Sequence, residues 1–150
     1  MDTNITKTWI IEIDADSVFN RCTDETLYQA YSRNEENPKY DAVVIQDDDR
    51  GQFNFYYASA LANLQMLLAR RMESAPTTSG NKTSFHLSMH DNHDDNIKTI
   101  LISHCYEYVV RQILEQWYQK DFGSMLEKLE INHCLHYRKN PVRRRFGPLF

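Results

Sequence analysis

The chain is poor in the two residues that most often interrupt regular structure. Its 150 residues include only four glycines and four prolines. Folds built from many short strands, such as sandwiches and barrels, need more of both residues for their tight turns. The scarcity therefore favours long helices, and the length fits one domain.

Long apolar runs and paired cysteines are also lacking. No stretch approaches the ~20 apolar residues that cross a bilayer, and the first seven residues are polar, so we expect neither a membrane span nor a signal peptide. The three cysteines, Cys22, Cys105 and Cys134, form no Cys-x-x-Cys pair. We expect reduced, partly buried thiols in a chain that folds in a cytosol.

Hydrophobic spacing predicts a mainly α fold, a helical bundle with one or two short β-strands and an extended C-terminal arm. The aspartates at positions 14 and 16 are candidate caps for the first helix, and those at 47–49 for the second. Helices 50–73 and 94–119 are predicted to pack together. The predicted elements are strands at 8–13 and 84–90, helices at 16–33, 50–73, 94–119 and 121–137, loops at 34–41 and 74–82, and a strand or extended connection at 42–45.

Six metal-capable side chains gather within ten residues. Zinc and iron sites use histidine and carboxylate ligands, but this spacing matches no pattern such as His-Glu-x-x-His. On a strand, the first two histidines share the solvent face, and the aspartates suit the start of the next helix. We interpret the segment as structural, with a metal-dependent enzyme as the alternative. The six residues are His86, His90, Asp91, His93, Asp94 and Asp95.

Two His-Cys dipeptides, His104-Cys105 and His133-Cys134, raise the question of a nucleophile. Neighbouring residues on a helix point about 100° apart, so neither dipeptide is a dyad by itself. A pairing across helices stays open, but core packing is the better interpretation. The chain has no Gly-x-Ser-x-Gly motif and no glycine-rich phosphate loop. The run 47–49 lacks the glycine and distal glutamate of a calcium loop. We expect no enzyme, no metal and no cofactor.

Charge is divided between two parts of the chain. The net charge is −4, but residues 138–150 carry five cations and no acid, which leaves 12 basic and 21 acidic residues in 1–137. The sequence thus predicts an acidic helical domain at 1–137, of charge −9, and a basic arm at 138–150, of charge +5.

The arm combines cations with apolar residues at its end. The cations could contact phosphates, whereas the closing Phe-Gly-Pro-Leu-Phe resembles an apolar plug for another protein's groove. A solvated tail and a nucleic-acid-binding module are the alternatives, and the acidic domain disfavours the latter by repelling phosphate. The predicted partner-binding residues are Arg138, Lys139, Arg143, Arg144, Arg145, Phe146, Leu149 and Phe150.

From about residue 50 onward the order of elements resembles a known group of proteins. The strand Phe85-His-Leu-Ser-Met89, the turn 91–96, the helix with Glu107-Tyr-Val-Val110 and Trp117-Tyr118, and the basic segment 137–144 carry the likeness. They resemble small virion proteins of tailed bacteriophages of gut Bacteroides-type hosts, similar to the helical head–tail connector (adaptor) proteins under the portal.

This resemblance implies a structural virion subunit of the neck or tail region, assembled in the host cytoplasm. Such proteins commonly form twelve-subunit rings, so a homo-oligomer bound to the portal protein and to other neck or tail proteins is expected, with incidental contact to DNA in the channel left open. A tail-completion protein or another virion ring component is the alternative. The resemblance brings no catalytic residues.

Overall fold

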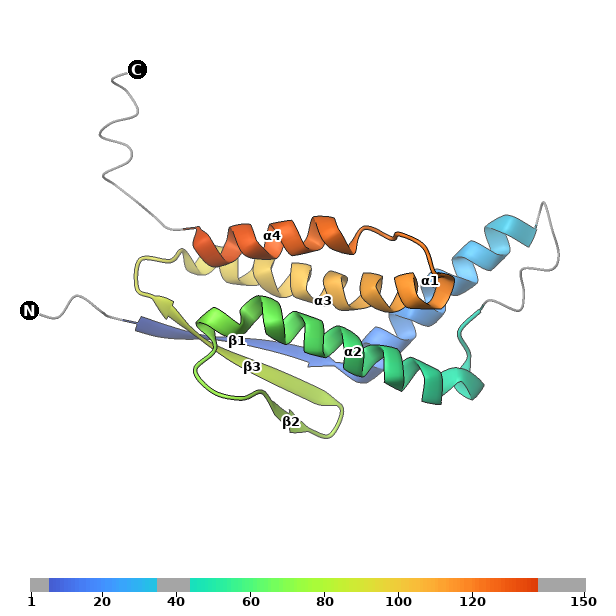
Figure 1. The fold of residues 1–150 in the computed structure, drawn as a ribbon, viewed down its shortest axis with the longest axis horizontal. Helices are drawn as coiled ribbons and strands as arrows, with labels where there is room; N and C mark the ends of the chain where they lie inside the picture. The colour runs from blue at the N-terminus through green and yellow to red at the C-terminus, as the bar shows by residue number, and fades with distance from the viewer. Residues whose placement is uncertain (1–5, 35–43, 138–150) are drawn as a thin grey trace, which may run out of the picture.

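The computed structural model describes residues 6–34 and 44–137, and it confirms a mainly helical fold with a small antiparallel sheet (Figure 1). Two short 3₁₀ turns, η2 (Asp47–Asp49) and η3 (Ala69–Arg71), flank the second helix. The other elements are β1 (Thr6–Asp14), α1 (Ala15–Asn34), α2 (Arg50–Leu68), β2 (Thr77–Ser79), β3 (Lys82–His90), α3 (Asp95–Tyr118) and α4 (Ser124–His136).

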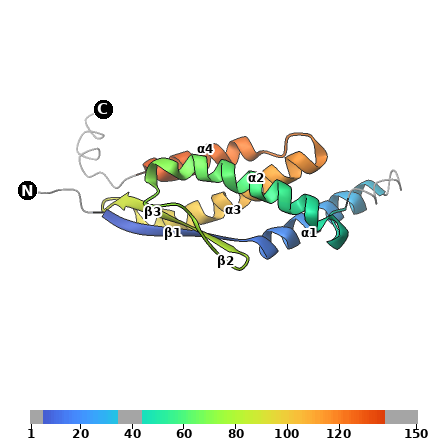
Figure 2. The same ribbon diagram turned by 60° about the horizontal axis from the view of Figure 1, so that its bottom comes forward.

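The sheet places β3 between β1 and β2, with both pairings antiparallel. Alternation along the two long strands sends one set of side chains into the core, as the sequence predicts for 84–90. Buried Phe85, Leu87 and Met89 alternate with the partly exposed histidines and serines of β3. Helices α2, α3 and α4 lie on one side of the sheet (Figures 1 and 2), and no described element covers the other face, where the side chains of β1 and β3 are exposed or partly exposed.

The segment after α2 differs from the sequence expectations in two ways. Helix α2 ends at Leu68 because the chain then turns to follow β3: Met72 bridges Leu87, and the Glu73 N–H donates to the His86 carbonyl at 2.9 Å. Strand β2 lies inside the predicted loop 74–82, since residues 77–79 are all exposed and carry no alternation that would reveal a strand.

Helix α3 forms the centre of the helical layer and contacts α1, α2, α4 and β1. The predicted packing of α2 on α3 is confirmed. Leu64 and Leu101, at 0% exposure, belong to a core that also takes in Trp9 of β1 and Ile131 of α4. Among the helices of the described stretches, none is both long enough and apolar enough to cross a bilayer.

Helix caps follow the predicted acids in two places. The Asp14 carboxylate accepts a hydrogen bond from the Asp16 N–H at 3.0 Å, and Asp94 is the N-cap of α3 and accepts from the Asn96 N–H at 3.0 Å. Helix α4 differs, because its N-cap is Gly123, which has no side chain and a φ of +88°.

Replacing two glycines by alanine is expected to have opposite effects on stability. Gly123→Ala places a Cβ 2.8 Å from Arg111 Nη1 in a backbone conformation that L-residues rarely adopt, so we expect a loss of about 1–2 kcal/mol. Gly51→Ala in α2 meets open space and gains up to ~1 kcal/mol from helix propensity. Urea unfolding of both variants measures the difference, and a stabilised Gly123→Ala variant would contradict the α4 cap described here.

Candidate functional site

The predicted partner-binding residues of the arm, 138–150, lie outside the described residues, but the structure shows where the arm is attached. Helix α4 ends at His136, and Tyr137 follows with extended backbone. This end of α4 lies at the same end of the molecule as the beginning of β1 (Figures 1 and 2). The arm therefore continues from one end of the helical layer.

A hollow of about 560 Å³ lies beside this attachment point, between the end of α2 and the end of α4. We call it the root hollow. Its floor is apolar and its rim carries cations, without an acid among the lining residues. The lining residues are Met66, Leu67, Arg70, Arg71, Asn132, Leu135 and His136.

A second hollow, of about 490 Å³, lies at the other end of α2, between α1 and the segment before α2. We call it the acidic hollow. Apolar groups line its interior and two carboxylates its rim, without a cation among the lining residues. The lining residues are Phe19, Asn20, Thr23, Val44, Ile45, Gln46, Asp47 and Asp48.

The three aspartates at 47–49 lie just before α2 and differ in their contacts. The Asp49 carboxylate accepts the Gln46 N–H at 2.9 Å, across the turn η2. Asp49 is the N-cap residue of α2, but its side chain makes no capping hydrogen bond to that helix, so the predicted capping of α2 by the run 47–49 is not seen at this residue. Asp47 and Asp48 are exposed, and no described residue pairs with either of them. Their charge is therefore open to a partner.

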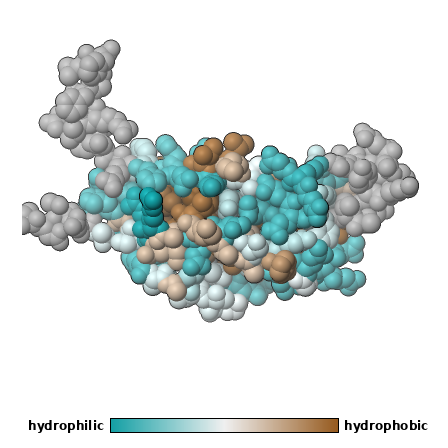
Figure 3. All heavy atoms as spheres, in the orientation of Figure 1, coloured by the Kyte–Doolittle hydropathy of each residue, from teal (hydrophilic) through white to brown (hydrophobic). Residues whose placement is uncertain are grey.

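A third surface feature is the outward face of α4. Met125, Leu126 and Leu129 are 61%, 65% and 58% exposed, although they belong to a helix whose other face is in the core. Figure 3 shows hydrophobic surface at the upper edge of the molecule, where α4 lies. Clustered apolar side chains of this size are typical of protein interfaces.

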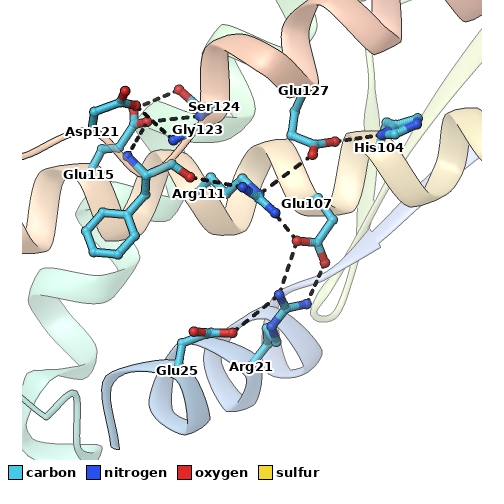
Figure 4. A network of polar contacts seen from close by, with 11 residues as sticks. Arg21, Glu25, His104, Glu107, Arg111, Glu115, Asp121, Gly123, Ser124 and Glu127 are labelled. Atoms are coloured by element: carbon cyan, nitrogen blue, oxygen red, sulfur yellow. Dashed lines mark hydrogen bonds and ion pairs between the residues drawn. The ribbon is translucent and has the colours of Figure 1, made fainter. Parts of the chain in front are cut away.

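A network of ion pairs crosses from α1 over α3 to α4 (Figure 4). Arg21 donates to Glu107 at 2.5 and 3.1 Å, and this hydrogen bond raises the pKa of the guanidinium. Arg111 Nε lies 3.5 Å from a Glu107 oxygen and 3.7 Å from a Glu127 oxygen. Glu127 in turn lies 2.6 Å from His104 Nδ1. Arginines and glutamates alternate from Arg21 to Glu127, so the network ties three helices together.

Glu115 supplies the cap that Gly123 cannot. Its carboxylate, on α3, accepts the N–H groups of Phe122 and Ser124, each at 3.0 Å, and the Ser124 hydroxyl at 2.7 Å. The first N–H groups of a helix have no partner within it. A side chain from α3 therefore fixes the start of α4 against its neighbour.

We expect Glu115→Ala to lower the free energy of unfolding by about 2 kcal/mol, because three hydrogen bonds to a charged acceptor are lost at a partly buried turn. Glu130→Ala, an exposed carboxylate on α4, is the matched control and should change stability by less than 0.5 kcal/mol, as is usual at the surface. Urea unfolding compares the two. Equal effects would contradict the assignment of Glu115 as the cap.

The structure separates the predicted histidine–aspartate cluster. His86 and His90 lie on the open face of the sheet, whereas His93 is 1% exposed. Its ring lies 3.1 Å from the Leu135 carbonyl through Nε2 and edge-on to Trp9. Within residues 6–34 and 44–137, no three His, Cys, Asp or Glu side chains come together in a way that could hold a metal ion.

The cysteines are all free and buried. Burial raises the pKa of the Cys22 thiol to about 12 and raises those of Cys105 and Cys134 as well. The thiols are protonated at neutral pH, and a thiol is a much weaker nucleophile than a thiolate. Across α3 and α4 the structure pairs His104 with Glu127 rather than with a cysteine.

Comparison of the chain with protein-family models, with curated proteins and with solved structures gives no match. Sequence reasoning also missed several of the features above. The i, i+4 spacing of Glu107 and Arg111 is a local signal for one ion pair. Arg21 and Glu107, by contrast, are 86 positions apart, and nothing local connects them.

Proposed function

We propose that this protein is a structural subunit of a bacteriophage neck, which forms a ring as a head–tail connector between portal and tail. The observation that carries the proposal is the division of charge between a +5 arm ending in apolar residues and a −9 domain. Opposite charges on two parts of one chain favour contacts between copies and set their register.

Two features of the described residues support assembly. The root hollow and the acidic hollow lie at opposite ends of α2 and differ in charge, so one end of a copy complements the other end of the next. Contacts between unlike surfaces generate rings when the rotation closes. The apolar outer face of α4 adds a surface of the kind that subunits bury.

The test is removal of residues 138–150. We expect the shortened protein to keep the helical signal of the intact protein in circular dichroism, because its core lies within the described residues. It should lose the ring seen by light scattering and electron microscopy, and any attachment to the portal complex. Assembly of the intact protein should fall only in part from low to high salt, because salt screens the cations but not the apolar anchor.

A nucleic-acid-binding module is the second candidate, and the cationic rim of the root hollow beside the arm favours it. In that case duplex DNA would bind the intact protein with a steep loss of affinity as salt rises, since each phosphate contact releases counterions. A folded truncated protein that still assembles normally, together with such a salt slope, would replace the connector proposal with this one.

A further inference from the structure

The arm needs a surface on which to dock, and the acidic hollow has the matching chemistry. Phe19 and Ile45 supply an apolar interior, and Asp47 and Asp48 supply negative charge at the rim. The Thr23 hydroxyl, which lines the hollow, is buried and has no hydrogen-bond partner among the described residues.

The hollow is held in shape by contacts that leave its rim open. The Thr26 hydroxyl, at 0% exposure, accepts the Ile45 N–H at 3.0 Å and so ties the segment before α2 to α1. Arg50 stacks over the Phe19 ring, 4.1 Å from its centre, and its charge is paired with Asp16. The Arg50 charge beside the hollow is thus already paired with a carboxylate.

We propose that residues 143–150 of the arm of a second copy occupy the acidic hollow. This inference rests on the proposed ring assembly and names the surface that would join neighbours. Three arginines at 143–145 would face Asp47 and Asp48, and the adjoining Phe146 would enter the apolar interior. Buried aromatic anchors flanked by complementary charge are typical of tight protein contacts.

The root hollow is nearer to the arm, but Arg70 on its rim carries the same charge as the arm, and the described lining residues include no acid. Like charges would repel the arm there, whereas the acidic hollow attracts it. The choice of hollow therefore follows from charge rather than from proximity.

A second copy is favoured over the same copy by the reach of the arm. The two hollows are separated along α2, which spans about 28 Å at 1.5 Å per residue. Phe146 lies nine residues after Tyr137 and reaches at most about 32 Å when fully extended. Docking within one copy would require an almost straight chain along the body, whereas docking on a neighbour requires no such path.

The experiment uses two full-length charge-reversed variants. In the hollow variant, Asp47→Lys and Asp48→Lys turn the rim positive. In the arm variant, Arg143→Glu, Arg144→Glu and Arg145→Glu turn the arm negative. Each variant alone should fail to assemble, because its arm and hollow now have the same sign. Mixed together, each arm meets a hollow of opposite sign on the other variant, so the mixture should assemble at a 1:1 ratio.

Two controls address charge and folding. Asp91→Lys with Glu130→Lys makes the same change in net charge at exposed positions elsewhere and should assemble as the unaltered protein does. Lysines at the start of α2 oppose the helix dipole, so thermal unfolding of the hollow variant is recorded, and Asp47→Asn with Asp48→Asn serves as the milder variant. Assembly by the hollow variant alone, or a mixture that stays unassembled while each variant is folded, would overturn the proposal.

A peptide titration distinguishes failure of the ring proposal from failure of the docking proposal. If the unaltered protein is monomeric, a synthetic peptide of residues 138–150 is titrated into the arm variant, whose own arm cannot compete for its intact hollow. Binding that weakens at least tenfold when Asp47→Asn and Asp48→Asn are added supports the hollow as the docking site even without a ring. Equal binding to both proteins, or none to either, excludes it.

Discussion

Leu101→Asp should lower the free energy of unfolding by at least about 5 kcal/mol, which is enough to leave much of the protein unfolded or insoluble. Leu101 is 0% exposed at the contact between α3 and its neighbours. Truncation of a buried leucine already costs 2–5 kcal/mol, and an unpaired carboxylate adds several more. Total stabilities of small domains are about 5–15 kcal/mol.

The preceding residue gives the matched control. Ile100 is 46% exposed on the same turn of α3, so Ile100→Asp carries the same charge into water and should cost no more than about 1 kcal/mol. Leu64→Asp on α2, also at 0% exposure, should behave as Leu101→Asp does. Soluble Leu101→Asp protein with an unchanged melting transition would show that the core has been assigned wrongly.

His93→Ala is expected to cost about 3 kcal/mol, whereas the double variant His86→Ala, His90→Ala should cost less than about 1 kcal/mol. His93 connects the turn after β3 to α4 through the Leu135 carbonyl and packs against Trp9, so its removal leaves a cavity and a carbonyl without its donor. Within the described residues, the His90 ring accepts the Asn92 N–H and makes no other hydrogen bond, at a partly exposed site.

Urea unfolding and elemental analysis test this contrast together. A double variant as unstable as His93→Ala would show that the sheet histidines have a structural role that the described contacts do not reveal. About one zinc or iron per chain, lost in the double variant, would revive the metal-dependent enzyme that the sequence left as an alternative.

Local patterns predicted most of the elements and the packing of α2 on α3, but not the other contacts between elements. The alternation through Phe85, Leu87 and Met89 and the helical spacing in 94–119 are local signals, because buried faces repeat with the period of the element. The ion pair of Arg21 with Glu107 and the pairing of β1 with β3 join residues far apart in the chain. Nothing in a short window records such partners.

Of the proposed docking pair, the arm could be predicted from the sequence, but the acidic hollow could not. The arm was visible as a run of cations followed by apolar residues, because composition alone marks it. The acidic hollow was not, since it is formed where residues 19–23 meet residues 44–48 and depends on the hydrogen bond between Thr26 and Ile45. The aspartates at 47 and 48 were predicted only as helix caps. Because they line the same hollow as Phe19, they also give that hollow its negative charge.

The strand order has a consequence for synthesis. β1 leaves the ribosome before β3, and its partner residues in β3 follow 68–84 positions later. At 5–20 residues per second, roughly 3–17 s pass before the pair can form. During that interval Trp9, Ile11 and Ile13 belong to an unpaired strand with one apolar face, which is a segment prone to aggregation. Chaperones that bind nascent chains should therefore protect β1 until β3 is synthesised, and slower translation should lower the soluble yield.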